Sequence, residues 1–260
     1  MRAALAQPRS VRDGLAVPWH RALAIAVGIV AVLALLYFAA RATSVFAVRT
    51  LEIEGGTPAV RAAVRAAAGR VEGRSLVGLD GGALVRELEA LPSVRSATYD
   101  RAFPSTLRIF VRAERPLAVI SGSARWIVSE RGRVIGPATE DMRGHLPHFR
   151  LPTGTTLHPG AFVTAPAARV ILAALAVAPR RFPAAIDDVR LQAGALTLGL
   201  RAPWGTPELR LGEPVDVKLK LAVAALVLRS LAAAERPSVA YVDVSVPERT
   251  VVGPNPQPEG

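Results

Sequence analysis

The stretch of residues 22–40 constrains this chain more than any other feature. It holds nineteen consecutive residues without a charge or a proline. As a helix rising about 1.5 Å per residue, it would be about 28 Å long, which is close to the hydrocarbon thickness of a bilayer. Trp19 and Tyr37 stand near its ends, where aromatic side chains favour the membrane interface. We predict a single transmembrane helix at residues 22–40.

Charge predicts the orientation of that helix. The short tail before it, residues 1–21, contains four arginines and one aspartate. Basic segments beside an anchor stay on the cytoplasmic side, so we expect a type II protein of the plasma (inner) membrane with an extracytoplasmic body. A cleaved signal peptide is the alternative, since Ala40-Arg41-Ala42 has the small-x-small form of a cleavage site. The apolar run is longer than the usual core of a signal peptide, which favours an uncleaved anchor.

Composition excludes several function classes. The chain has no cysteine, which rules out disulfides, thiolate metal sites and cysteine nucleophiles. The net charge of +11 comes almost entirely from arginines that are spread through the body, while aromatic residues make up only 5%. A nucleic-acid platform would interleave basic and aromatic residues, so we predict no nucleic-acid partner. The bland interpretation is a solvated surface, and attraction to acidic lipids or acidic partners is the alternative.

The first part of the body predicts a small two-layer module. The expected elements are a strand at 45–55, helices at 57–68 and 81–90, and strands at 94–100 and 106–114. Thr57 before Pro58 is typical of a helix start, Asp80 can cap the second helix, and Leu91-Pro92 ends it. The order β-α-α-β-β predicts a sheet with two helices on one face, over residues 45–115.

The second part, residues 116–252, predicts a mixed α/β domain with an antiparallel sheet, which makes the whole chain an α+β protein. The expected strands lie at 117–120, 125–128, 133–135, 186–192, 195–200, 208–211, 239–246 and 250–252, and the expected helices at 164–178 and 216–234. The helix at 216–234 is strongly apolar, but three basic residues interrupt it, so we expect a core helix rather than a second membrane span. Residues 253–260 are rich in proline and predict a disordered tail.

Catalytic chemistry finds little support in the sequence. His145, His148 and His158 could be imagined as a metal site, but Pro147 prevents the helical spacing that such a site would use. The chain has no Gly-x-Ser-x-Gly, no Ser-x-x-Lys and no phosphate-binding glycine loop. We therefore predict no catalytic residue, no metal, no cofactor and no small-molecule substrate, and expect a protein that binds other proteins.

Several ordered motifs resemble one known family. They are Leu91-Pro92-Ser93-Val94-Arg95-Ser96-Ala97, then Arg101-x-x-Pro104-x-Thr106-Leu107-x-Ile109-x-Val111, then Glu114-Arg115-Pro116. This set resembles the POTRA domain of the FtsQ/DivIB cell-division proteins, which also have a short cytoplasmic tail, one anchor, a POTRA domain and a second domain. The similarity continues at 126–135, with Ser129 where the family usually has an acid, and at 208–246.

The resemblance implies a function. FtsQ/DivIB proteins are non-enzymatic scaffolds of the division complex at the septum, so we expect FtsB/DivIC-like and FtsL-like partners, and other septal division proteins as well. Two alternatives from other classes are a membrane-anchored enzyme acting on the cell wall and a POTRA-bearing secretion or assembly protein. An enzyme would need a convergent polar constellation in a pocket, and an assembly protein would carry repeated POTRA units.

The last predicted strand offers a site for such a partner. Residues 250–252 should form a sheet edge, and unpaired backbone groups at an edge invite another chain to add as a strand. The resemblance places FtsB/DivIC binding at this end of the domain, and Pro254 with the tail could instead only protect the edge. The predicted partner-binding residues are Tyr241, Val244, Val246, Thr250, Val251 and Val252.

The hairpin between the two strands at 94–114 gives a second set of candidates. Arg101, Pro104 and Arg108 are predicted to dock neighbouring division proteins. The alternative is that Arg101 and Pro104 only shape the connection between the strands.

Overall fold

The computed structural model describes residues 19–42, 44–122, 124–139, 146–151, 155–179, 181–234 and 239–254. Helix α1 (Trp19–Ala42) contains the predicted apolar segment, and its residues 19–39 form a span of 21 residues with no burial inside the protein. This helix is long and apolar enough to cross a membrane once, which suggests single-pass anchoring. Most of the predicted cytoplasmic tail, residues 1–18, lies outside the described residues.

The first sheet has the predicted order of elements. They are β1 (Thr50–Gly55), α2 (Pro58–Ala68), α3 (Gly81–Ala90), β2 (Val94–Ala102) and β3 (Thr106–Ala113), with strand order β1-β3-β2. Two short 3-10 turns complete it, η1 (Ser44–Phe46) and η2 (Gly69–Val71). The strand predicted at 45–55 therefore begins only at Thr50, because its first residues form η1.

Local chemistry explains the start of α2. The Thr57 hydroxyl accepts a hydrogen bond from the Val60 N–H (3.3 Å), and Pro58 occupies the first helical position. Val60, Val64 and Ala68 then recur at helical spacing and are buried. The helix ends at Ala68, as predicted, and its C-cap Gly69 keeps a right-handed conformation and begins η2.

The second sheet has nine strands. Its elements are β4 (Pro116–Ser121), β5 (Arg125–Ser129), β6 (Val134–Pro137), β7 (His148–Arg150), α4 (Pro166–Ala176), β8 (Ala185–Gln192), β9 (Ala195–Arg201), β10 (Glu208–Gly212), α5 (Val217–Ala233), β11 (Val239–Asp243), η4 (Pro247–Arg249) and β12 (Val251–Pro254). The strand order is β12-β11-β10-β9-β8-β7-β4-β5-β6. Most pairs are antiparallel, as predicted, but β4–β7, β7–β8 and β10–β11 are parallel, so the sheet is mixed.

Some predictions for this domain differ from the structure. Strand β7 was not predicted, because three residues are too few to show alternation. The strand predicted at 239–246 ends at Asp243, and the last strand extends to Pro254. The prediction of a disordered tail from residue 253 is therefore wrong for Gly253 and Pro254, and residues 255–260 lie outside the described part.

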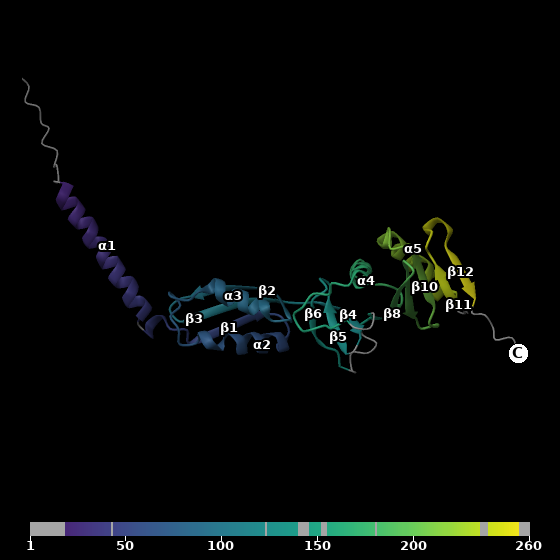
Figure 1. The fold of residues 1–260 in the computed structure, drawn as a ribbon, viewed down its shortest axis with the longest axis horizontal. Helices are drawn as coiled ribbons and strands as arrows, with labels where there is room; N and C mark the ends of the chain where they lie inside the picture. The colour runs from purple at the N-terminus through teal and green to yellow at the C-terminus, as the bar shows by residue number, and fades with distance from the viewer. Residues whose placement is uncertain are drawn as a thin grey trace, which may run out of the picture. The chain divides into compact units, whose positions relative to one another are not determined.

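One hydrophobic core holds the second sheet and its helices together. Helices α4 and α5 lie on the same side of the sheet (Figure 1), and their buried residues join those of the strands in a single cluster. Helix α5 is the core helix that the sequence predicts, and it buries Leu221 and Leu228. Lys220 is buried as well, and its ammonium donates to the carbonyl oxygens of Leu211 (2.9 Å) and Glu213 (2.8 Å). This lysine therefore fastens α5 to the turn that follows β10.

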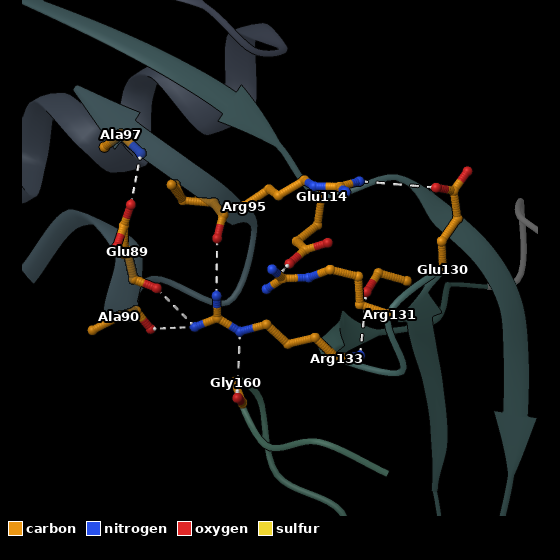
Figure 2. Close-up of polar contacts among 11 residues, drawn as sticks. Glu89, Ala90, Arg95, Ala97, Glu114, Glu130, Arg131, Arg133 and Gly160 are labelled. Atoms are coloured by element: carbon orange, nitrogen blue, oxygen red, sulfur yellow. Dashed lines mark hydrogen bonds and ion pairs between the residues drawn. The ribbon is translucent and has the colours of Figure 1, made fainter. Parts of the chain in front are cut away.

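A buried arginine connects α3 to the start of the second sheet (Figure 2). Only 7% of Arg133 is exposed. Its guanidinium donates to the carbonyl oxygens of Glu89 (2.9 Å) and Ala90 (3.0 Å) at the end of α3, and to those of Val94 (2.9 Å) and Gly160 (3.4 Å). The last carbonyls of a helix have no partner within the helix and carry the negative end of its dipole, so they suit a cation.

Ion pairs and backbone bonds surround this contact. The Arg131 guanidinium lies 3.1 Å from a Glu114 carboxylate oxygen, and only 1% of the Glu114 side chain is exposed. The backbone N–H of Arg133 donates to the hydroxyl of Ser129 (3.2 Å), and Ser129 is fully buried. Ser129 therefore has a structural role at the position where the FtsQ/DivIB pattern usually has an acid.

We predict that Arg133→Met lowers the free energy of unfolding by about 2–4 kcal/mol, because several buried carbonyl groups lose their donor at once. Arg169→Met is the matched control, since Arg169 is exposed on α4 and should change stability by less than about 0.5 kcal/mol. Urea unfolding followed by tryptophan fluorescence measures both. Equal midpoints for the two variants would show that the buried contact contributes nothing.

Candidate partner-binding edge

The two ends of the second sheet differ. At one end, β6 is covered by residues 160–161, since the Val134 N–H donates to the Ala161 carbonyl and the Gly160 N–H donates to the Val134 carbonyl, both at 2.8 Å. At the other end lies β12, and among the described residues no strand pairs with its outer side. Its backbone N–H and C=O groups on that side are therefore open to another chain.

Pairing with β11 fixes the faces of β12. Val251 lies opposite Asp243, and Val252 lies opposite Val242, so the two valines point to opposite faces of the sheet. Val251 is 52% exposed and Val252 is 40% exposed. The edge thus offers an apolar side chain on each face, beside unpaired backbone groups.

The other predicted residues of this end fall into different environments. Val246 is 50% exposed, just before η4. Thr250 precedes β12, and its hydroxyl donates to the Pro247 carbonyl (3.3 Å). Val244 is fully buried in the core, so the prediction that it contacts a partner is wrong for its side chain. Strand β11 ends at Asp243, so neither Val244 nor Val246 lies within it.

The chain before β12 is held from several sides. The Val244 N–H donates to the Arg210 carbonyl (2.9 Å), and the Ser245 N–H donates to the Asp243 carboxylate (2.9 Å). A Cβ atom at Gly212 would stand 2.8 Å from the Ser245 Cβ, so the turn that Lys220 fastens lies directly against this segment. These contacts fix the start of the edge independently of any partner.

Tyr241 connects the edge to a row of charges across the sheet. A Cβ atom at Gly253 would stand 2.1 Å from the Tyr241 ring, so the ring covers this glycine of β12. The Arg210 guanidinium lies over the same ring, 4.1 Å from its centroid, in a cation–π contact. Tyr241 therefore packs against the outermost strand rather than standing free for a partner.

The charges continue along β10 and β8. Glu208 lies 3.7 Å from Arg210 and accepts a hydrogen bond from Arg190 at 2.8 Å, and Arg190 lies 3.0 Å from Asp188. The hydrogen bond to Glu208 and the charge of Asp188 raise the pKa of Arg190 above its ordinary value. These groups are half exposed, so each pair contributes little by itself.

The hairpin candidates of the first sheet have separate roles. The Arg101 guanidinium donates to the Leu79 carbonyl (2.7 Å), which supports the interpretation that Arg101 shapes the fold. Pro104 is exposed in the connection between β2 and β3. Arg108 of β3 pairs with Glu52 of β1 at 2.8 Å, and its side chain is half exposed. Of the three candidates, Pro104 and Arg108 are therefore accessible to a partner.

The sequence interpretation missed Arg133 and Lys220. Both bind carbonyl groups rather than acids, and no residue pattern marks such partners. In the described ranges no group of three or more His, Asp or Glu residues could hold a metal ion, and His145 lies outside those ranges.

Comparison with known proteins identifies the first sheet. Residues 46–113 match the family model for the POTRA domain, FtsQ-type, and these residues span β1 to β3 with both helices. A search of curated proteins found no significant match. The chain thus has an N-terminal apolar helix, then an FtsQ-type POTRA domain, then a mixed-sheet domain, an arrangement that supports an FtsQ/DivIB-family protein.

Proposed function

We propose that the protein is a non-enzymatic, membrane-anchored scaffold of the bacterial division complex at the septum. The observation that carries this proposal is the FtsQ-type POTRA domain at residues 46–113, in a chain with one apolar N-terminal helix. The proposed domains are a POTRA domain at 45–115 and a partner-binding domain at 116–252. Its partners would be FtsB/DivIC-like and FtsL-like division proteins.

Strand addition at β12 is the proposed mode of binding. An extended segment of an FtsB/DivIC-like partner would pair with the open side of β12, and backbone hydrogen bonds would supply most of the affinity. Val251 and Val252 would contact the partner's side chains on the two faces of the sheet, and Val246 would extend this contact towards η4. Tyr241 and Arg210 would support β12 from inside the sheet.

Depletion of the protein in its own host tests the division role. We expect undivided filamentous cells. Division should resume when the full chain is supplied again. Depletion of a secretion or assembly protein would instead give envelope defects in cells that still divide. The other alternative, a cell-wall enzyme, would need a catalytic residue. Normal division during depletion would contradict the proposal.

A reporter fused after Gly260 tests the orientation. We expect activity only from a reporter that works outside the cytoplasm, because the arginine-rich tail should stay inside. The matched control carries the same reporter before Met1 and should show the opposite pattern. A cytoplasmic signal from the fusion after Gly260 would overturn both the orientation and the septal scaffold.

Proline substitutions in β12 test strand addition. Consecutive residues of an edge strand direct their N–H groups alternately to the neighbouring strand and to solvent, so Val251→Pro and Val252→Pro remove donors on opposite sides. The variant that loses the outward donor should bind an FtsB/DivIC-like partner about 30- to 150-fold more weakly. The missing donor and the distortion of its neighbours together would remove two or three hydrogen bonds of about 1 kcal/mol each.

Two controls make this test specific. Val251→Thr keeps the backbone donor and nearly the same shape, so its partner affinity should stay within about threefold of the wild type. Circular dichroism should show that the proline variants remain folded, because proline is tolerated at sheet edges. Unaltered affinity in both folded proline variants would exclude strand addition at β12.

A further inference from the structure

A cavity of about 570 Å³ lies on the face of the second sheet that α4 and α5 leave uncovered. The alternation of the strands establishes the face. Ile120 and Phe149 point into the core beneath the helices, while their neighbours Ser121, His148 and Arg150 line the cavity. A cavity of this size is within the range that holds ligands or side chains of a partner.

The strand register brings two arginines to either side of one hydroxyl. Ser121 of β4 pairs with Arg125 of β5 on one side and with Arg150 of β7 on the other. Neighbouring strands lie about 4.8 Å apart, so the two arginines start roughly 10 Å from each other, with Ser121 between them. His148 is two residues before Arg150 on the same strand and therefore points to the same face.

Positive charge dominates the cavity. Among the described residues, its lining contains Arg125, Arg150 and Arg201 and one acid, Asp187, which pairs with Arg201 at 2.7 Å. Three arginines and one aspartate give a formal charge of +2. The Arg150 side chain is exposed, and within the described part of the chain its guanidinium has no hydrogen-bonding or ion-pair partner. The site is thus electrostatically complementary to an anionic ligand.

The floor of the cavity is apolar. Val119 is buried beside Ser121 on the same face, and Ala138 and Leu146 add further apolar surface. A bare phosphate or sulfate would pair with the arginines but would leave the apolar floor exposed to water. A carboxylate on a short hydrocarbon stem, as in a glutamate side chain, would use both.

We propose that this cavity binds an acidic segment of a partner protein, with a glutamate or aspartate carboxylate held between Arg125 and Arg150. The cationic groups come from three strands, β5, β7 and β9, which fits an extended segment with more than one carboxylate. Arginine binds carboxylates through paired, charge-assisted hydrogen bonds. This site uses β4, β5, β7, β8 and β9, so it is separate from the proposed edge at β12 and does not depend on it.

Binding of a defined probe tests the proposal. The probe is a fluorescent hexapeptide with three glutamates and blocked ends, and its counterpart carries glutamines instead. The full chain is used in non-ionic detergent, and fluorescence anisotropy measures the affinity. We expect binding of the glutamate peptide only, weakened when KCl rises from about 50 to about 300 mM, because salt screens the attraction.

Three variants assign the residues. Arg125→Gln and Arg150→Gln should each weaken binding about tenfold, since each removes charge-assisted hydrogen bonds. Arg169→Gln is the charge-matched control on α4, across the sheet, and should bind like the wild type. Val251→Pro should also bind the peptide normally, so a failure of the edge proposal would not affect this result.

Three outcomes would overturn the proposal. The first is wild-type binding in both Arg125→Gln and Arg150→Gln, with folding verified by circular dichroism. The second is equal binding of the glutamine peptide, or no binding of either peptide at about 1 mM. The third is competition by inorganic phosphate as effective as that of the unlabelled acidic peptide, which would assign the cavity to small anions.

Discussion

The hydrogen bonds of the buried Arg133 guanidinium are the interaction on which the junction of α3 with the nine-stranded sheet depends. Taking a cation out of water is costly unless hydrogen bonds compensate, and here carbonyl oxygens do so without an acid bonded to the guanidinium. One acceptor is Gly160, whose N–H bonds to Val134 of β6. The same side chain thus stabilises the end of α3 and the segment that covers one end of the nine-stranded sheet.

That covering makes the two sheet ends unequal. In β6 the N–H and C=O of Val134 are bonded to residues 160–161, whereas among the described residues β12 has an open side and an exposed valine on each face. Exposed edges favour uncontrolled pairing, and proteins usually protect them. A short β12 of four residues, preceded by Pro247, limits this hazard while keeping the edge accessible. The asymmetry therefore favours one defined place for strand addition.

Much of this fold could be predicted from the sequence, for local reasons. The apolar helix α1, the Thr57 cap of α2 and the core helix α5 follow from composition, capping and periodicity, which act within a few residues. Val244 was misassigned because alternation cannot show that a strand ends at Asp243. The contacts of Arg133 and Lys220 and the pairing of Ser121 with Arg150 could not be predicted, since they involve carbonyl groups or a strand distant in sequence.

The packing of Tyr241 over Gly253 has an evolutionary consequence. Position 253 is restricted from within the molecule, because any larger side chain would collide with the ring. Val251 and Val252 face no comparable restriction, since both are exposed. In the outermost strand, the fold thus requires glycine at position 253, whereas Val251 and Val252 can be replaced without a clash. Lineages could change the valines together with a partner's sequence and acquire mutually exclusive pairs, while the sheet itself remained the same.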